Sequence, residues 1–126
     1  MLNKGLRDQE SIRIDNVLKK LMSLVYLPKF WNLEDLLNVE NELKDLAMNV
    51  ESLNEFSESE LIIHLQRLHL DWNQLELFAD FLVAFSKGSQ FNFLQKAIVI
   101  YNYIQQESKV FSFGILNKLA AAKANL

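Results

Sequence analysis

The chain repeats one local signal that marks the start of an α-helix. In this signal an apolar residue precedes a polar capping residue, and a second apolar residue lies four positions beyond the cap, where the two can pack together. The cap accepts hydrogen bonds from backbone N–H groups that the first helical turn leaves without partners. The four signals predict helix starts at Trp31, Asn32 and Leu36; at Phe56, Ser57 and Leu61; at Leu70, Asp71 and Leu75; and at Phe111, Ser112 and Leu116.

The scarcity of turn-forming residues supports the same fold class. The 126 residues include 3 glycines and 1 proline, too few for the turns of a β-sandwich or barrel. A chain of this length supports one core, which excludes a two-domain enzyme. We therefore predict an all-α fold, a single bundle of about six helices in one domain over residues 1–126, with an N-terminal helix pair (1–56) and a C-terminal helical hairpin region (57–126).

Apolar spacing and breakers place the six helices. The first ends before Pro28, because a proline disfavours helical geometry in the residue ahead of it. Gly88 is expected to end the fourth helix in a left-handed conformation. The predicted ranges are Asp8 to Leu27, Leu33 to Leu53, Glu58 to His69, Trp72 to Lys87, Gln90 to Gln106 and Phe113 to Lys123.

The fourth and fifth helices are apolar almost all round, which is typical of helices buried by neighbours. We expect them to form a central hairpin joined by Lys87, Gly88 and Ser89. The segments Ala97 to Tyr103 and Val110 to Phe113 also suit strands by composition, and length favours helix. The aromatic side chains of this region form core or line a ligand cavity, and we expect core for Phe78, Phe81, Phe85, Phe91 and Phe93.

The hairpin that opens at Trp72-Asn73-Gln74-Leu75 resembles the helix pairs of tetratricopeptide-like repeat proteins. Trp72 and Leu75 match the family's opening aromatic and Leu, and Gly88 matches its small residue. The family's Gly and Tyr fall on Glu76 and Ala79, and its later Phe and Pro fall on Asn92 and Ile100.

The order of elements is also similar to that of small uncharacterised bacterial all-helical proteins with a repeat-like C-terminal half. The apolar hairpin and the tail from Tyr103 to Phe113 carry this second resemblance. This second resemblance covers about the last half of the chain and implies an interaction module.

Charge and composition restrict the partners. A net charge of −3 gives no general attraction to nucleic acid or anionic lipid. No uncharged run approaches the roughly 20 residues of a membrane span, and the absence of cysteine suits a reducing compartment, so we expect a cytoplasmic protein. From Glu34 to Glu60 there are 9 acidic residues against Lys44 alone, whereas Lys4 to Lys29 holds 6 basic and 3 acidic residues. This acidic ridge is either a solvated face beside the basic first helix or a docking surface for a basic partner.

No motif for catalysis or cofactor binding is present. Glu60, His64 and His69 are the only cluster with metal-ligand chemistry, and their spacing matches neither a zinc-protease motif nor a carboxylate-bridged iron site. Five serines lie at predicted helix ends, where a hydroxyl caps backbone groups or hydrates a turn: Ser57, Ser86, Ser89, Ser108 and Ser112. We expect no catalytic, metal or cofactor site.

The sequence therefore favours a non-catalytic helical module for protein interaction or self-association. Its second predicted helix carries apolar residues at alternating steps of three and four, a packing seam that a partner helix can occupy. The alternative function is a small helical carrier that binds an apolar molecule between the aromatic-rich helices. Phe30 either packs into the core or joins an exposed apolar patch. The predicted partner-binding residues are Leu36, Leu43 and Val50 as apolar anchors, Glu40, Glu42 and Glu51 as steering charges, and Phe30.

Overall fold

The computed structural model describes the backbone of residues 2–26 and 32–126, and the side chains of residues 8–26 and 32–126. Its described residues form seven α-helices and no strand, which confirms the all-α fold class. The helices are α1 (Leu2–Tyr26), α2 (Leu33–Lys44), α3 (Val50–Glu55), α4 (Glu58–Arg67), α5 (Trp72–Gly88), α6 (Leu94–Glu107) and α7 (Phe113–Ala124).

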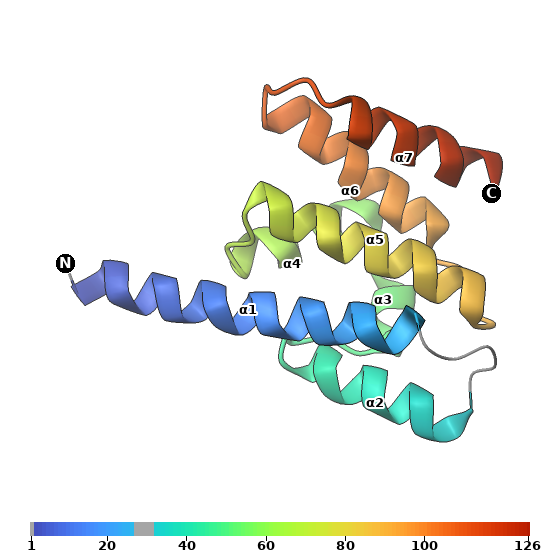
Figure 1. Ribbon diagram of the computed structural model, residues 1–126, viewed down its shortest axis with the longest axis horizontal. Helices are drawn as coiled ribbons and strands as arrows, with labels where there is room; N and C mark the ends of the chain where they lie inside the picture. Colours follow the sequence, from blue (N-terminus) through green and yellow to red (C-terminus); the bar gives the residue numbers. More distant parts are fainter. Residues whose placement is uncertain (1, 27–31) are drawn as a thin grey trace.

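Five of these helices pack side by side in the order α2, α1, α5, α6, α7 (Figure 1). Helices α1, α5 and α7 run in the same direction, and α2 and α6 run in the opposite one. The short helices α3 and α4 lie behind this layer, with α4 against α6. The predicted central hairpin is confirmed, because α5 packs between α6 and α1.

A buried polar side chain helps to hold α5 against α1. Gln74 is 2% exposed, and its Nε2 donates to Asp15 Oδ1 at 2.8 Å and to the carbonyl oxygen of Ser11 at 3.1 Å. Its Oε1 accepts from the backbone N–H of Asp71 at 2.9 Å. A buried amide with all of its partners adds specificity to the packing without an unsatisfied group.

The predicted helix starts are confirmed at all four caps. Asn32, Ser57, Asp71 and Ser112 each accept a hydrogen bond from the backbone N–H three residues later. The bond is reciprocated by the side chain at that position in α2, α4 and α5. Trp31, the apolar residue before the first cap, lies outside the described residues.

The predicted helix from Leu33 to Leu53 is wrong in one respect, because the chain leaves the helix at residues 45–49 and starts again as α3. Ala47 takes a left-handed conformation with φ 55°. The backbone N–H groups of Met48 and Ala47 donate to the carbonyls of Leu43 (3.2 Å) and Lys44 (2.9 Å), the two bonds of a Schellman motif.

Four residues hold the restart after this break. Asn49 and Ser52 form a reciprocal capping box at the start of α3. Glu40 Oε1 accepts from the backbone N–H of Val50 at 2.6 Å. Leu46, Val50 and Leu53 are all buried. After the break, the second half of the predicted apolar seam therefore packs into the core and does not continue along α2.

The α5–α6 turn also differs from prediction. Gly88 is the last residue of α5 and has no positive φ, and α6 begins at Leu94 rather than near Gln90. Serine hydroxyls close the turn instead: Ser86 Oγ accepts from the backbone N–H of Phe93 at 2.7 Å, and Ser89 Oγ donates to the carbonyl of Phe85 at 2.6 Å.

Candidate ligand-binding groove

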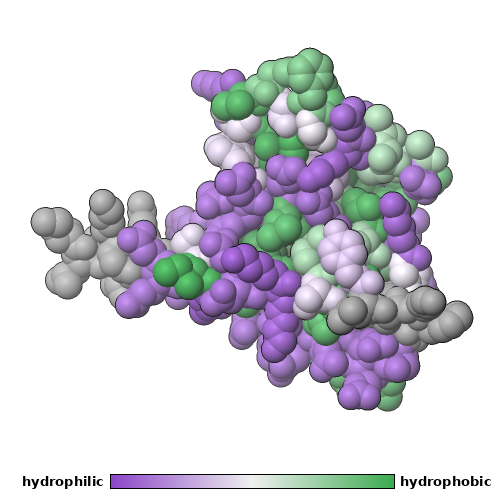
Figure 2. Space-filling view, in the orientation of Figure 1, coloured by the Kyte–Doolittle hydropathy of each residue, from purple (hydrophilic) through white to green (hydrophobic). Residues whose placement is uncertain are grey.

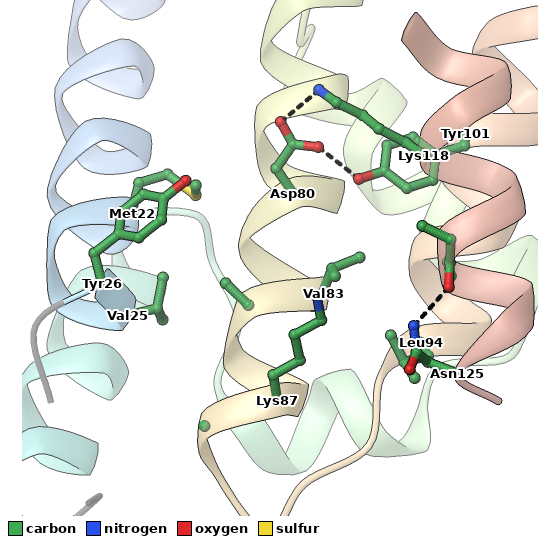
Figure 3. A pocket seen from close by; sticks show the side chains of 14 residues that line it. Met22, Val25, Tyr26, Asp80, Val83, Lys87, Leu94, Tyr101, Lys118 and Asn125 are labelled. Carbon is green, nitrogen blue, oxygen red and sulfur yellow. Dashed lines mark hydrogen bonds and ion pairs between the residues drawn. The ribbon is translucent and has the colours of Figure 1, made fainter. Parts of the chain in front are cut away.

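A groove of about 650 Å³ lies over the second half of α5, between the end of α1 and the C-terminal half of α7. Apolar surface is visible there between α1 and α7, bordered by hydrophilic surface (Figure 2). Figure 3 shows α5 as the floor, with α1 and α7 on opposite sides. Half of the lining residues have apolar, non-aromatic side chains: Met22, Val25, Val83, Ala84, Leu94, Ala121 and Ala122. The other lining residues are Tyr26, Asp80, Lys87, Gly88, Tyr101, Lys118 and Asn125. We call this the α5 groove.

One end of the α5 groove holds a connected set of polar groups. Lys118 on α7 reaches two carboxylates of α5 that are one turn apart, Glu76 at 2.5 Å and Asp80 at 2.9 Å. The hydroxyl of Tyr101, on α6, donates to the other oxygen of Asp80 at 2.5 Å. These bonds tie three helices together, and every ionised group in the set has a partner of opposite charge.

Burial and neighbouring charges shift two pKa values in this set. Burial, together with the hydrogen bond to Asp80, raises the pKa of the Tyr101 hydroxyl far above its ordinary value. Burial lowers the pKa of Lys118, but hydrogen bonds and charge interactions with Glu76 and Asp80 outweigh it, so the pKa is raised above the ordinary value. At neutral pH the lysine is therefore charged and the tyrosine is neutral.

The other end of the α5 groove holds a cation without an acidic partner. Lys87 lies near the C-terminal end of α5, and its side chain extends along the groove toward Val83 (Figure 3). Within the part of the chain that the structure describes, no carboxylate pairs with its ammonium group. The lining thus combines an apolar floor, a polar set whose charges are already paired, and one unpaired positive charge.

The predicted apolar anchors of the second helix are buried or half-buried. Leu43 has no exposed surface and Val50 is 6% exposed, both in the core, and Leu36 is half-buried against it. A partner therefore cannot contact Leu43 or Val50 in this conformation. Phe30 lies outside the described residues.

Two of the three predicted steering charges have internal partners. Glu42 is 8% exposed and forms an ion pair with Lys20 of α1 at 3.0 Å, and Glu40 holds the start of α3. Glu51 is exposed. Arg13 of α1 donates to the carbonyl of Asp45 at 2.7 Å, so basic α1 does lie against acidic α2, as the charge distribution suggests.

The aromatic side chains that the sequence offered as the lining of a carrier's cavity stack on one another in the core. Phe81 stacks on Phe85 with ring centroids 5.5 Å apart, and Phe85 contacts Phe91 at 5.7 Å. Phe78, Phe81, Phe85 and Phe93 are buried, which confirms them as core, and Phe91 is half-buried against it. The α5 groove lies outside this aromatic cluster.

The histidine cluster forms no metal site in the described residues. His64 Nε2 lies 2.9 Å from the carbonyl oxygen of Leu46 in the α2–α3 break, so this side chain satisfies a backbone carbonyl. Glu60 accepts from the backbone N–H of Ser57, and this bond lowers the pKa of the Glu60 carboxyl. His69 is exposed and ends α4 with φ 58°.

The sequence contains a signal for the groove that the spacing rules did not use. Glu76 and Asp80 are the only acidic residues within α5, a helix that is otherwise largely apolar, and they are four residues apart. When neighbouring helices bury a helix, its charged residues require partners of opposite charge. Glu76 and Asp80 therefore indicate a cation on another element. Which cation it is, Lys118, follows only from the path of α7.

No helix among the described residues combines the length and apolar character needed to cross a bilayer. No protein-family model, curated protein or solved structure matches this chain.

Proposed function

We propose that this protein is a non-catalytic binding protein whose α5 groove holds an elongated amphipathic molecule with an apolar body and one anionic group. The observation that carries the proposal is the combination of an apolar floor with a single unpaired cation, Lys87. This is the carrier function that the sequence offered as its alternative, moved from the α5–α6 interior to the outer side of α5.

The size and lining of the groove support a small-molecule ligand. Pockets that hold such molecules enclose roughly 300–1,000 Å³, are mostly apolar, and fix the ligand with a few polar groups. The α5 groove, at about 650 Å³, lies within that range. Three helices that run in the same direction and border a shared groove also resemble the concave binding surfaces of helical-repeat proteins.

The charge of the ligand follows from which lining groups already have partners. Asp80 and Glu76 pair with Lys118, so a cationic ligand would have to break those ion pairs. An anion at the opposite end meets Lys87, and its apolar body then lies over Val83 and Ala84. A carboxylate paired with an ammonium near a protein surface is stabilised by a few kcal/mol at most, so the apolar body supplies most of the affinity.

Calorimetric titration with dodecanoate and with 1-dodecanol, both below their aggregation limits, tests this function. The parent protein should bind both, and Lys87→Gln should weaken dodecanoate about tenfold, which corresponds to about 1.4 kcal/mol, while leaving dodecanol unchanged. Ala84→Trp, which fills the groove, should abolish both. Lys44→Gln, at an exposed position on α2, is the matched control.

Two results would contradict the proposal. If neither probe gives binding heat and neither displaces a fluorescent anilinonaphthalene sulfonate, the groove does not bind a ligand of this class. Unchanged binding in Ala84→Trp would place it elsewhere on the molecule.

A second candidate function, the protein-interaction module that the sequence favours, has its own supporting observation. Four exposed apolar side chains lie close together in the sequence at the start of α7, away from the acidic ridge: Val110, Phe111, Phe113 and Leu116. Concentrated apolar surface of this kind is typical of contact sites between proteins.

A further inference from the structure

The floor of the α5 groove is polar at both ends and apolar in the middle. Asp80 and Lys87 both line it, and because they are seven residues apart on α5 they lie on the same side of the helix. Val83 and Ala84, both half-buried, come between them. Figure 3 shows Asp80 beside Lys118 at one end and Lys87 at the other. A ligand that follows α5 from Lys87 therefore meets a second polar site.

This second site, the pair of Asp80 and Lys118, keeps hydrogen-bonding capacity after its internal bonds are formed. Lys118 has three N–H donors, of which Glu76 and Asp80 take two, and the third has no acceptor among the residues that the structure describes. Each carboxylate oxygen of Asp80 accepts one bond, from Lys118 or from Tyr101, and can accept another. Both side chains are partly exposed, at 37% for Lys118 and 23% for Asp80, so a ligand can reach them.

The charges of the pair favour a neutral group. Lys118 and Asp80 have opposite signs and lie 2.9 Å apart. An anionic group here would be repelled by Asp80, and a cationic group would be repelled by Lys118. A hydroxyl is neutral, and it can accept a hydrogen bond from Lys118 while it donates one to Asp80.

We propose that the ligand of the α5 groove is a medium-chain ω-hydroxycarboxylate, with its carboxylate at Lys87 and its hydroxyl at the pair of Asp80 and Lys118. This inference rests on the proposed function and names the class of ligand within it. Seven residues of α-helix span about 10.5 Å. An extended aliphatic chain advances about 1.2 Å per bond, as an extended backbone does, so about nine bonds separate the two polar groups. This is the length of 10-hydroxydecanoate.

Calorimetric titration of the parent with decanoate, 10-hydroxydecanoate and 3-hydroxydecanoate tests the ligand class. The terminal hydroxyl should tighten binding about tenfold over decanoate, because it bonds to two charged groups that the methyl end of decanoate only covers. 3-Hydroxydecanoate has the same composition as 10-hydroxydecanoate but carries its hydroxyl near the carboxylate. It should bind no more tightly than decanoate.

A variant of the polar pair tests where the hydroxyl binds. In Lys118→Met, the ratio of the dissociation constants of decanoate and 10-hydroxydecanoate should fall from about ten to about one. The ratio cancels any effect of the substitution that the two acids share. Lys123→Met, on the same helix but exposed and outside the lining of the groove, is the matched control and should keep the ratio of the parent.

Four results would overturn the proposal. The first is equal binding of decanoate and 10-hydroxydecanoate by the parent, and the second is an equal gain from 3-hydroxydecanoate. The third is an unchanged ratio in Lys118→Met. The fourth is tighter binding of decanedioate or 10-aminodecanoate than of 10-hydroxydecanoate, because the polar pair would then select a charge. If decanoate still binds and depends on Lys87, only the ligand class is wrong. If neither acid binds, the proposed function is wrong as well.

Discussion

Three helices of this chain, α2, α4 and α6, are followed by a left-handed residue that is not glycine. Ala47, His69 and Lys109 have positive φ values of 55°, 58° and 59°, and no described glycine does. The sequence rule that expects glycine at a left-handed helix end therefore pointed to Gly88, which is helical, and missed Ala47. Side-chain caps were predicted correctly because Asn, Ser and Asp are chemically distinctive at that position, whereas an alanine at a helix end looks like any other alanine.

The strain at Ala47 leads to a prediction about stability. A left-handed conformation costs an L-residue roughly 1–2 kcal/mol, and glycine avoids this at some expense in chain entropy. Ala47→Gly should therefore raise the free energy of unfolding by about 0.5–1 kcal/mol in urea denaturation. Ala47→Val at the same position is the comparison and should lower it, because a β-branched side chain worsens the clash. A lower unfolding free energy in Ala47→Gly would contradict the left-handed conformation of residue 47.

The raised pKa of Tyr101 predicts how stability changes in alkali. A tyrosine in the unfolded chain ionises near pH 10, whereas the buried Tyr101 hydroxyl stays protonated. A folded-state pKa above the unfolded one stabilises the fold fully at lower pH, and this contribution is lost as the pH rises above about 10. The loss is at most about 1.4 kcal/mol per pH unit.

Urea unfolding at pH 8 and pH 11 measures this effect. The decrease in unfolding free energy should be smaller in Tyr101→Phe than in the parent, since Lys118 is present in both. Tyr26→Phe, which removes an exposed hydroxyl, should follow the parent. If the unfolding free energy falls equally between pH 8 and pH 11 in all three proteins, the raised pKa of Tyr101 is contradicted.

At the scale of helices, the α2–α3 break explains why the clearest periodic pattern in the sequence predicted the wrong element. Leu43, Leu46, Val50 and Leu53 follow helical spacing and are all buried, so the pattern identified core residues correctly. It wrongly predicted one straight helix, because apolar spacing does not register the bonds that break it. These are the backbone bonds to the carbonyls of Leu43 and Lys44 around left-handed Ala47 and the bond from Val50 to Glu40, ten residues earlier. The partner-facing role of the seam depended on that straight helix.

The buried position of Leu43 predicts the effect of introducing a charge into α2. Leu43→Asp removes a side chain with no exposed surface and leaves a carboxylate without a partner, which should lower the unfolding free energy by about 3–5 kcal/mol. Leu37→Asp, on the same helix but 58% exposed, should change it by less than about 1 kcal/mol. Thermal and urea unfolding of the pair measure the contrast. Equal melting temperatures would show that Leu43 faces solvent.

At the scale of the whole molecule, the order of packing determines where stability is concentrated. Helix α5 has neighbours on both sides, α1 and α6, whereas α7 packs mainly against α6. Local opening requires less free energy where fewer apolar contacts are lost. The sequence predicted the central hairpin, because apolar residues surround both of its helices, but it did not predict which neighbours cover each side.

Amide hydrogen exchange measured by mass spectrometry should follow this order. Peptides from α5 and α6 should exchange only through global unfolding, and peptides from α7 and α2 should exchange sooner. Faster exchange in α5 than in α7 would contradict the packing order.

The ammonium group of Lys118 fixes how far α7 can slide along its neighbours. Glu76 and Asp80 are one helical turn apart, and a single cation lies between them. A shift of α7 by one turn, about 5.4 Å, in either direction moves the ammonium away from at least one carboxylate and leaves that negative charge half-buried and uncompensated. The ion pairs of Lys118 therefore favour one longitudinal position of α7 against α5, and with it one position of the α7 wall of the α5 groove.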